Sequence, residues 1–326
     1  DVERSRGLGD VYKRQLINLP VGLMGWIATL RWMPDSRAVL PHRFDLSGFL
    51  LLAIAMVSIS LSLDGLSGIG MQRALVVVLM LGGFAGLAAY WLHALRHPAP
   101  LFSPMLFRNG SFRVGLLGNL FARIGSGSMP FLIPLLLQVC LGYSPMQAGM
   151  MMLPVALASM GMKRFATPLI RSQGYRRVLV GNTLLIGVLI ASFSLIGPEM
   201  PLPLKILMLV VFGAFNSLQF TAMNTVTLKD LETTDASAGN SMLSMVQMLA
   251  MSMGVTVAAA LLSTFEQWLE PRPGFDTLDT FHAAFICIGL ITAASAWIFW
   301  QLEADDHPDV RSRKEDAHKP QDVPLD

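Results

Sequence analysis

Long apolar blocks alternate with short polar loops along most of this chain, from residue 16 to residue 302. The blocks are too long and too uniformly apolar to be surface helices of a soluble domain, which carry a polar face. A helix needs roughly 20 apolar residues to cross the core of a bilayer, so the blocks have the length of membrane spans. The pattern predicts nine spans, at residues 16–32, 46–63, 74–95, 112–139, 145–162, 178–196, 204–223, 236–265 and 281–302.

The two ends of the chain depart from this pattern. Residues 1–15 are polar and charged and lack the basic, apolar and small-residue order of a signal peptide. Their string GLGDVYKRQ resembles translated adapter read-through, so we expect a non-native or artefactual leader. Residues 303–326 are almost free of apolar side chains and are expected to form a disordered cytoplasmic tail.

Lysine and arginine are distributed unevenly between the loops. Short cytoplasmic loops of membrane proteins carry an excess of these residues. The loops on the other side hold Arg73, Lys205 and Arg272. Twelve basic residues lie on the alternate loops, which are therefore predicted to be cytoplasmic together with the C-terminus: Arg31, Arg37, Arg43, Arg96, Arg108, Arg113, Lys163, Arg164, Arg171, Arg176, Arg177 and Lys229.

Composition supports an all-α membrane protein. Hydrophobic residues make up 53% of the chain and charged residues 14%, whereas soluble domains carry roughly 25% charged residues. The net charge of +2 is too small to indicate a nucleic-acid partner. Cys140 and Cys287 stand alone in apolar surroundings, so we interpret them as core residues rather than as a disulfide, zinc or redox pair.

One full charge, Arg123, lies near the middle of a predicted span. An arginine at that depth costs at least ~2.5 kcal/mol on insertion scales and normally faces a partner, a cavity or a substrate. Polar residues at spacings of three or four share its helix face, and similar stripes occur in the seventh and eighth spans. Because lipid cannot accept their hydrogen bonds, we expect these faces to converge on a cavity. The cavity candidates are Arg123, Asn119, Gln138, Asn216, Gln219, Asn240 and Gln247.

Two alternatives stay open for these polar residues. The amides could simply join helices, each contributing on the order of 0.6 kcal/mol. Arg123 could pair with backbone carbonyls or with a carboxylate from another part of the protein.

Glycine and proline residues follow Arg123 closely. Glycine lowers helix propensity and proline removes a backbone hydrogen bond, so we expect a kinked or partly unwound helix there. Such a break could serve transport or only improve packing. The predicted helix break comprises Gly125, Gly127, Pro130 and Pro134. Separately, Gly82 and Gly86 have the spacing of a close helix contact.

Catalytic motifs are missing from the sequence. It has no Walker loop, no HExxH and no nucleophile elbow, and no Asp or Glu lies in the middle of a predicted span. We therefore expect no enzyme activity, no cofactor and no metal site.

Several short blocks resemble one membrane-transport family. They are LINLPVG at residues 16–22, RFDLSGFLLL at 43–52, LDG at 63–65, RIGSG at 123–127, GMKR at 161–164, GYRRVLV at 174–180 and TLKDL at 227–231. In this order and spacing they resemble the fourteen-span drug/proton antiporters of the EmrB/QacA type, in the major facilitator superfamily, and within them the MdtD branch.

The resemblance implies a major facilitator fold and a division of the chain. Residues 16–32 would be the last helix of a truncated N-terminal bundle, lacking the family's first five spans. Residues 33–111 would hold two linker helices with their loops, and residues 112–302 the C-terminal six-helix bundle. Gly174, Arg176 and Arg177 would belong to a cytoplasmic gating loop, although Arg171 replaces the aspartate expected in a charge relay.

The same resemblance implies a function. It is alternating access by two bundles that rock around a midplane site, driven by protons, in an exporter of drugs or small molecules in the bacterial inner membrane. An alternative is an exporter of organic anions, such as carboxylates or their metal chelates, that uses Arg123; another is a non-transporting scaffold. Expected partners are the substrate, protons, the bilayer and the missing N-terminal bundle. Without a mid-span carboxylate, this chain should not couple protons alone.

Overall fold

The computed structural model describes residues 18–32, 45–66, 72–98, 100–232, 235–269 and 276–302. In this part of the chain every regular element is a helix. The predicted leader at residues 1–15 and the predicted tail at residues 303–326 lie outside the described residues. The chain divides into two compact units, Asp1–Arg43 and Phe44–Asp326, which are described separately.

The first unit contains one described helix, α2, at Asn18–Trp32. Its 15 residues are fewer than a bilayer core requires. Leu23, Trp26 and Leu30 are all exposed, so the helix presents an apolar surface of the kind that lipid or another apolar helix covers.

The described residues of the second unit form ten α-helices. They are α3 (Leu46–Leu66), α4 (Arg73–Arg96), α5 (Gly110–Val139), α6 (Pro145–Met150), α7 (Leu153–Gln173), α8 (Tyr175–Ser192), α9 (Leu202–Leu228), α10 (Ala236–Leu269), α11 (Thr277–Ala294) and α12 (Ala296–Trp300). Two short 3-10 helices, η1 (Pro104–Arg108) and η2 (Phe193–Leu195), precede α5 and follow α8.

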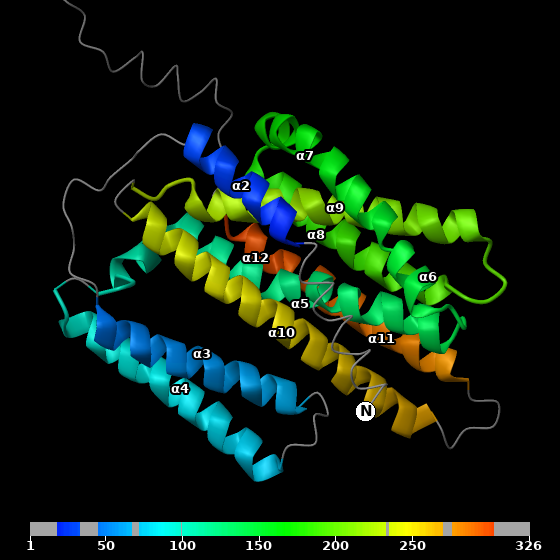
Figure 1. Ribbon diagram of the computed structural model, residues 1–326, viewed down its shortest axis with the longest axis horizontal. Coiled ribbons are helices and arrows are strands. Elements are labelled where there is room, and N and C mark those ends of the chain that lie inside the picture. Colours follow the sequence, from blue (N-terminus) through cyan, green and yellow to red (C-terminus); the bar gives the residue numbers. More distant parts are fainter. Residues whose placement is uncertain are drawn as a thin grey trace, which may run out of the picture. The chain divides into compact units, whose positions relative to one another are not determined.

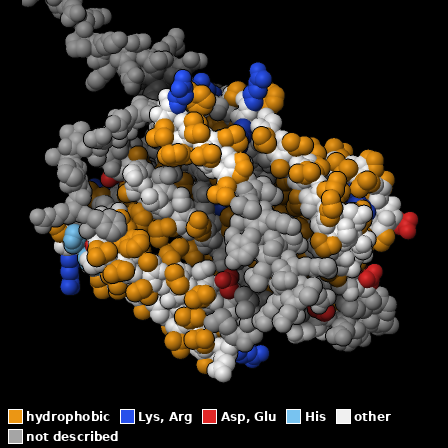
Figure 2. Space-filling model, in the orientation of Figure 1, with side chains coloured by type: hydrophobic (Ala, Val, Ile, Leu, Met, Phe, Trp, Pro, Cys, Tyr) orange, Lys and Arg blue, Asp and Glu red, His pale blue; other side chains and the backbone are white. Residues whose placement is uncertain are grey.

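Seven helical segments of the described residues are long and apolar enough to cross a membrane. Figure 2 shows hydrophobic side chains over much of the visible surface of the described helices, interrupted by few charged ones. Exposed hydrophobic side chains on this scale suit a lipid environment. The chain is therefore a multi-pass membrane protein. The seven segments are α3, α4, α5, α8 with η2, α9, α10, and α11 with α12.

The region of the fifth predicted span, residues 145–162, differs from the prediction. The short helix α6 ends at Met150, and α7 then runs on to Gln173. Lys163, Arg164 and Arg171 therefore lie on a helix, and not on a loop as predicted; all three are exposed. Lysine and arginine have high helix propensity, so their presence does not end a helix. Their long aliphatic side chains also allow the charged end to reach water.

Helix α5 lies at the centre of the second unit. It contacts α10, α9 and α11, whereas α3 and α4 pair mainly with each other and meet the rest chiefly through α10 (Figure 1). The hydroxyl of Thr256 on α10 donates to the backbone oxygen of Leu63 on α3 at 3.1 Å. The position of α5 places its polar stripe against several neighbours.

The helix break predicted in α5 is not observed as unwinding. The helix is continuous from Gly110 to Val139, with Pro130 and Pro134 inside it. Gly125 faces Thr292 on α11, and a Cβ at Gly127 would lie 3.1 Å from the Cα of Met251 on α10. The glycines thus let neighbouring helices approach closely. The packing of these helices stabilises the helical conformation of α5, although glycine and proline have low helix propensity. A hinge role for Gly125, Gly127, Pro130 and Pro134 stays a prediction.

Of the glycine pair predicted in the third span, Gly86 makes a close helix contact and Gly82 does not. Nothing lies within 4 Å of a Cβ built at Gly82, whereas Gly83 meets Ile59 and Gly86 meets Ala55 on α3. Gly83 and Gly86 therefore form the contact between α3 and α4. The spacing of glycines indicated a close contact but not the helix face that makes it.

Candidate functional site

Arg123 is buried near the middle of α5, with 7% of its surface exposed. Its Nε–H donates to Oδ1 of Asn119 at 3.3 Å. Its guanidinium carbon lies 4.1 Å from the ring centroid of Phe220 on α9. Its Nη2 is buried and has no hydrogen-bond partner among the described residues. The head group is therefore stacked on a ring and only partly satisfied by hydrogen bonds.

A chain of amides extends from Asn119 to the neighbouring helices. The Nδ2 of Asn119 donates to the Gly115 backbone oxygen at 3.0 Å and to Oγ1 of Thr227 on α9 at 3.4 Å. Gln247 on α10 donates from Nε2 to Oδ1 of Asn119 at 3.5 Å and to Oδ1 of Asn224 at 2.8 Å. We call Arg123 together with these partners the arginine cluster: Arg123, Asn119, Phe220, Asn224, Thr227 and Gln247.

No carboxylate accompanies this charge in the described part of the chain. Two ion pairs of the described residues lie elsewhere, between His93 and Asp45 and between Lys229 and Asp230. Because an arginine is effectively always protonated, the arginine cluster carries a net positive charge. One amide and one aromatic ring contact that charge, and two further amides are hydrogen-bonded behind Asn119. An unpaired guanidinium among neutral polar groups has the chemistry of a site for an anionic group.

The structure brings Arg123, Asn119 and Gln247 together, as the stripes on their helices indicated. The other candidates lie elsewhere. Gln138 donates to the Pro134 backbone oxygen of its own helix at 3.0 Å. Asn216 is half-buried on α9 and Asn240 is exposed near the start of α10, and neither takes part in the described contacts of Arg123.

Gln219 belongs to a different contact, between α9 and α8. Its Oε1 accepts from Nδ2 of Asn182 at 2.7 Å, and its Nε2 donates to Oγ1 of Thr183 at 2.6 Å. Both ends of the Gln219 amide are thus occupied by α8, which favours the helix-joining alternative for this residue.

The arginine cluster uses a different face of α9 from the predicted stripe. The predicted stripe contained Asn216 and Gln219, whereas the residues that reach α5 and α10 are Phe220, Asn224 and Thr227. These three also recur at spacings of four and three, so the signal was present. It was overlooked because one of them is aromatic and another, Thr227, lies close to the polar end of the span.

The predicted gating segment forms the turn between α7 and α8. Gly174 has a φ of 80°, a conformation that side chains rarely adopt, and it ends α7 and precedes α8. The guanidinium carbon of Arg176 lies 4.8 Å from the ring centroid of Trp300 on α12, whereas Arg177 is exposed. The structure thus fixes Arg176 against a neighbouring helix.

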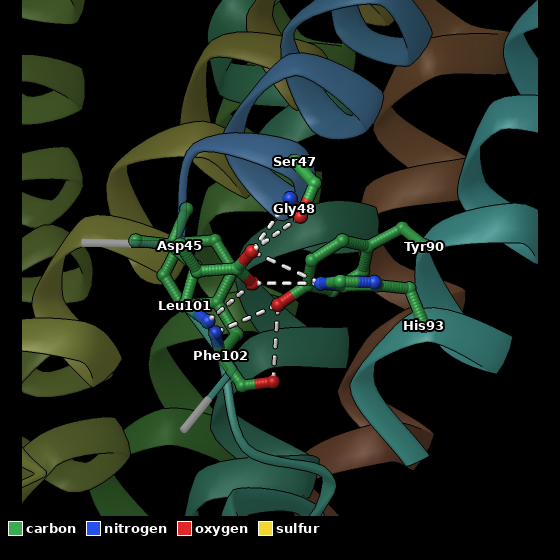
Figure 3. A network of polar contacts seen from close by, with 7 residues as sticks. All are labelled: Asp45, Ser47, Gly48, Tyr90, His93, Leu101 and Phe102. Carbon is green, nitrogen blue, oxygen red and sulfur yellow. Dashed lines mark hydrogen bonds and ion pairs between the residues drawn. The ribbon is translucent and has the colours of Figure 1, made fainter. Parts of the chain in front are cut away.

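A second polar cluster was missed entirely. Asp45, directly before α3, is 5% exposed and accepts from the Gly48 backbone N–H at 2.8 Å, the Ser47 hydroxyl at 3.0 Å and the Leu101 backbone N–H at 3.3 Å (Figure 3). The Nε2 of His93 lies 3.0 Å from both carboxylate oxygens. Burial alone would raise the pKa of Asp45, but these hydrogen bonds outweigh it and lower that pKa to about 2.

The phenol of Tyr90 completes this second cluster. It accepts from the Phe102 backbone N–H at 2.7 Å and donates to the Phe102 backbone oxygen at 3.1 Å. The aspartate cluster is defined as Asp45, Ser47, Gly48, Tyr90, His93, Leu101 and Phe102. Its sequence signals were the aspartate three residues before Gly48, as in a helix N-cap, and the spacing of four between His93 and His97.

A family model described as Major Facilitator Superfamily matches residues 115–323. The chain belongs to this superfamily. The match begins five residues into α5 and includes α6 to α12, so the arginine cluster lies inside the region that defines the superfamily. The aspartate cluster lies before it.

Similar proteins carry the name "Putative multidrug resistance protein MdtD". The relative from Yersinia enterocolitica is 44% identical over 295 residues, covering 89% of this chain and 62% of its own length. Those from Serratia proteamaculans and Salmonella heidelberg are 44% and 45% identical over 296 residues, covering 89% of this chain and 61% and 62% of their own lengths. The chain thus spans less than two thirds of these relatives.

These similarities confirm the predicted all-α major facilitator fold and the resemblance to the MdtD branch. The relatives carry the name of a multidrug resistance protein and not that of an enzyme, in line with the expectation of no enzyme activity. The division into bundles and linker helices stays a prediction.

Proposed function

We propose that this chain acts in the export of small molecules by alternating access across a bacterial inner membrane. The observation that carries the proposal is Arg123, buried and incompletely hydrogen-bonded at the contact of α5, α9 and α10 within the superfamily region. A buried charge in a membrane helix is costly, so it normally faces a substrate, a pathway or a partner. The name multidrug resistance protein, carried by the similar proteins, supports the direction of transport.

Two classes of substrate are proposed, and one observation separates them. Multidrug export follows the name of the similar proteins. Export of organic anions, such as carboxylates or their metal chelates, is favoured by the Nη2 of Arg123, which lacks a partner in the described residues. A guanidinium presents donors in a planar fork that fits a carboxylate, whereas it repels a cationic drug.

Proton exchange is the proposed source of energy. The carboxylates on the described spans are Asp64, Glu266 and Asp279, each within one turn of a helix end. A group that takes up a proton during transport usually lies at membrane depth. We therefore propose that the coupling group lies outside the described helices, and that these helices supply the substrate side of the mechanism.

The gating role of the α7–α8 turn is also a proposal. One support is the positive φ of Gly174 at the turn. The other is the contact of Arg176 on α8 with Trp300 on α12, because this contact would have to break if α12 moved relative to α8. A non-transporting scaffold remains the outcome expected if neither substrate class is exported.

The test compares two arginines on α5 in the full-length gene product. Arg123→Gln should lower efflux of the anionic dye carboxyfluorescein roughly ten- to a hundredfold, because a charged hydrogen bond contributes about 1.5–3 kcal/mol. Efflux of the cationic dye ethidium should be unchanged or faster. Arg113→Gln is the matched control, since Arg113 is exposed on the same helix.

Each alternative has its own outcome in this experiment. Undiminished carboxyfluorescein efflux in Arg123→Gln would remove Arg123 from the substrate site. Loss of the protein itself, measured as its amount in the membrane, would assign Arg123 a structural role. Absence of efflux of both dyes from the unmodified protein would favour the scaffold.

A further inference from the structure

Three side chains of metal-binding type meet where α3 begins and α4 ends. Asp45 precedes α3, His93 lies in the last turn of α4, and His97 follows α4 directly. One ligand atom from each residue lies within 4.8 Å of the other two. The rings of His93 and His97 have centroids 5.0 Å apart and planes inclined by 31°. Two imidazoles and one carboxylate thus lie close enough together to share one ion.

The carboxylate of Asp45 is held in place by groups that are not metal ligands. The Gly48 and Leu101 backbone N–H groups and the Ser47 hydroxyl fix its orientation, and its oxygens point toward His93 (Figure 3). Hydrogen bonds of this kind orient the ligands of known metal sites and strengthen their affinity. The aspartate is buried, whereas the side chain of His93 is 22% exposed, so an ion can enter from the imidazole side.

We propose that Asp45, His93 and His97 bind a divalent zinc ion. Imidazole nitrogen and carboxylate oxygen are ordinary zinc ligands, and a water molecule would complete a four-coordinate site. The lone pair of Nε2 of His93 would bind the ion, and the ring would carry its proton on Nδ1. Two ligands of a tetrahedral zinc ion lie roughly 3.4 Å apart. The Nε2 of His93, 3.0 Å from the Asp45 oxygens, would therefore move slightly away from them, and His97, within 4.8 Å of both, would approach by no more than about 1.5 Å.

Such an ion would join two helices directly and a third segment through a hydrogen bond to Asp45. Asp45 belongs to the start of α3, the imidazoles to the end of α4, and Leu101 to the segment that leads through η1 into α5. The site lies before the region matched by the superfamily and shares no residue with the arginine cluster. The ion would therefore stabilise the α3–α4 pair and would not take part in binding the exported molecule.

A His97→Gln variant distinguishes this site from a simple hydrogen bond. The substitution removes one ligand but leaves the contact of Asp45 with His93. The chain is purified in detergent with a tag that contains no histidine, stripped of metal, and titrated with Zn²⁺ against a chromophoric chelator. We expect the unmodified chain to bind one more ion than the variant, or to bind it at least tenfold more tightly. Zn²⁺ should raise the unfolding temperature of the unmodified chain only.

His282→Gln is the matched control. His282 is a half-buried histidine of α11 whose Nε2 contacts the Ile196 backbone oxygen at 3.0 Å. Its replacement should leave the zinc affinity unchanged. Equal zinc binding by the unmodified chain and by His97→Gln, or no zinc binding by the unmodified chain, would overturn the proposal.

A second variant retains a ligand at position 97. In His97→Cys, Co²⁺ should produce a thiolate-to-cobalt charge-transfer band that the unmodified chain lacks, although that chain also contains Cys140 and Cys287. The band would identify residue 97 as a ligand even if His97→Gln were to unfold. Its absence from folded His97→Cys would contradict the site.

Discussion

Among the described residues, lysine and arginine side chains lie over aromatic rings in four places. Membrane helices contain few acidic residues, and a ring face offers a cation an electrostatic partner without adding a second buried charge. The described pairs are Arg123 with Phe220, Arg176 with Trp300, Lys205 with Tyr143 and Lys229 with Tyr175. For Arg123 the ring also leaves the edge of the guanidinium open to hydrogen bonding, which a carboxylate partner would have occupied.

Cys140, directly after α5, supports a prediction about reactivity. Burial and the negative charge of Asp276 raise the pKa of its thiol to about 11. The thiolate is the reactive form, so at pH 8 only about one thousandth of the thiol can react. In a Cys287→Ser variant, alkylation by iodoacetamide should be slow at pH 8 and should accelerate about tenfold per pH unit up to about pH 10. Intact-protein mass spectrometry measures this rate.

The matched variant for this prediction is Asp276→Asn. Asp276 caps α11 by accepting from the Leu278 backbone N–H, and asparagine is an equally good cap, so the helix should be unaffected. Removing the charge should lower the pKa of Cys140 and speed alkylation at pH 8. A rate that levels off near pH 9 in the Cys287→Ser variant would contradict the raised pKa.

At the scale of the elements, backbone contacts at glycines fix how the helices cross. A Cβ at Gly187 on α8 would lie 2.7 Å from the Gly289 oxygen on α11, and one at Gly254 on α10 would lie 2.6 Å from the Ile124 oxygen on α5. The hydrophobic effect does not drive helices together inside a bilayer, because the lipid tails are as apolar as the side chains. Close approach of the helices therefore supplies much of the packing energy.

Two glycines of α8 test this account. Gly187→Ala should destabilise the protein by roughly 1–3 kcal/mol, the usual cost of overpacking, because the obstructing atoms belong to the backbone of α11. Gly181→Ala should be neutral or stabilising by up to about 1 kcal/mol, since nothing lies within 4 Å of its Cβ and alanine favours helix. Thermal unfolding in detergent compares the two variants. Equal unfolding temperatures would show that this crossing does not depend on close contact.

The sequence predicted the existence of these helices better than their faces. The length of the apolar stretches alone located α3, α5 and α9. In lipid, a single stretch of this length can satisfy its backbone hydrogen bonds only by forming a helix. The same signal failed for α7, because exposed lysine and arginine continue its helix beyond the apolar block. It also could not decide whether Gln219 or Asn224 faces α5, because both lie on polar stripes and only the packing of α8 against α9 separates them.

At the scale of the whole molecule, the distribution of basic residues among the loops predicts how the chain is oriented in the membrane. The turn between α7 and α8 is flanked by Arg171, Arg176 and Arg177, whereas the loop between η2 and α9 contains Glu199 and no basic residue before Lys205. Positive loops stay on the cytoplasmic side during insertion. The first loop is therefore predicted to be cytoplasmic and the second to lie outside.

Cysteine labelling in spheroplasts tests this orientation. In a chain carrying Cys140→Ser and Cys287→Ser, a membrane-impermeant maleimide should label Glu199→Cys in intact spheroplasts and Ser172→Cys only after permeabilisation. Both positions are exposed in the structure, so a difference in labelling reports the side of the membrane and not burial. Each variant is the control for the other, because the two loops are separated by a single predicted span, α8 with η2. Labelling of Ser172→Cys from outside would reverse the predicted orientation and place the Arg176–Trp300 contact at the external surface, where it could not act as a cytoplasmic gate.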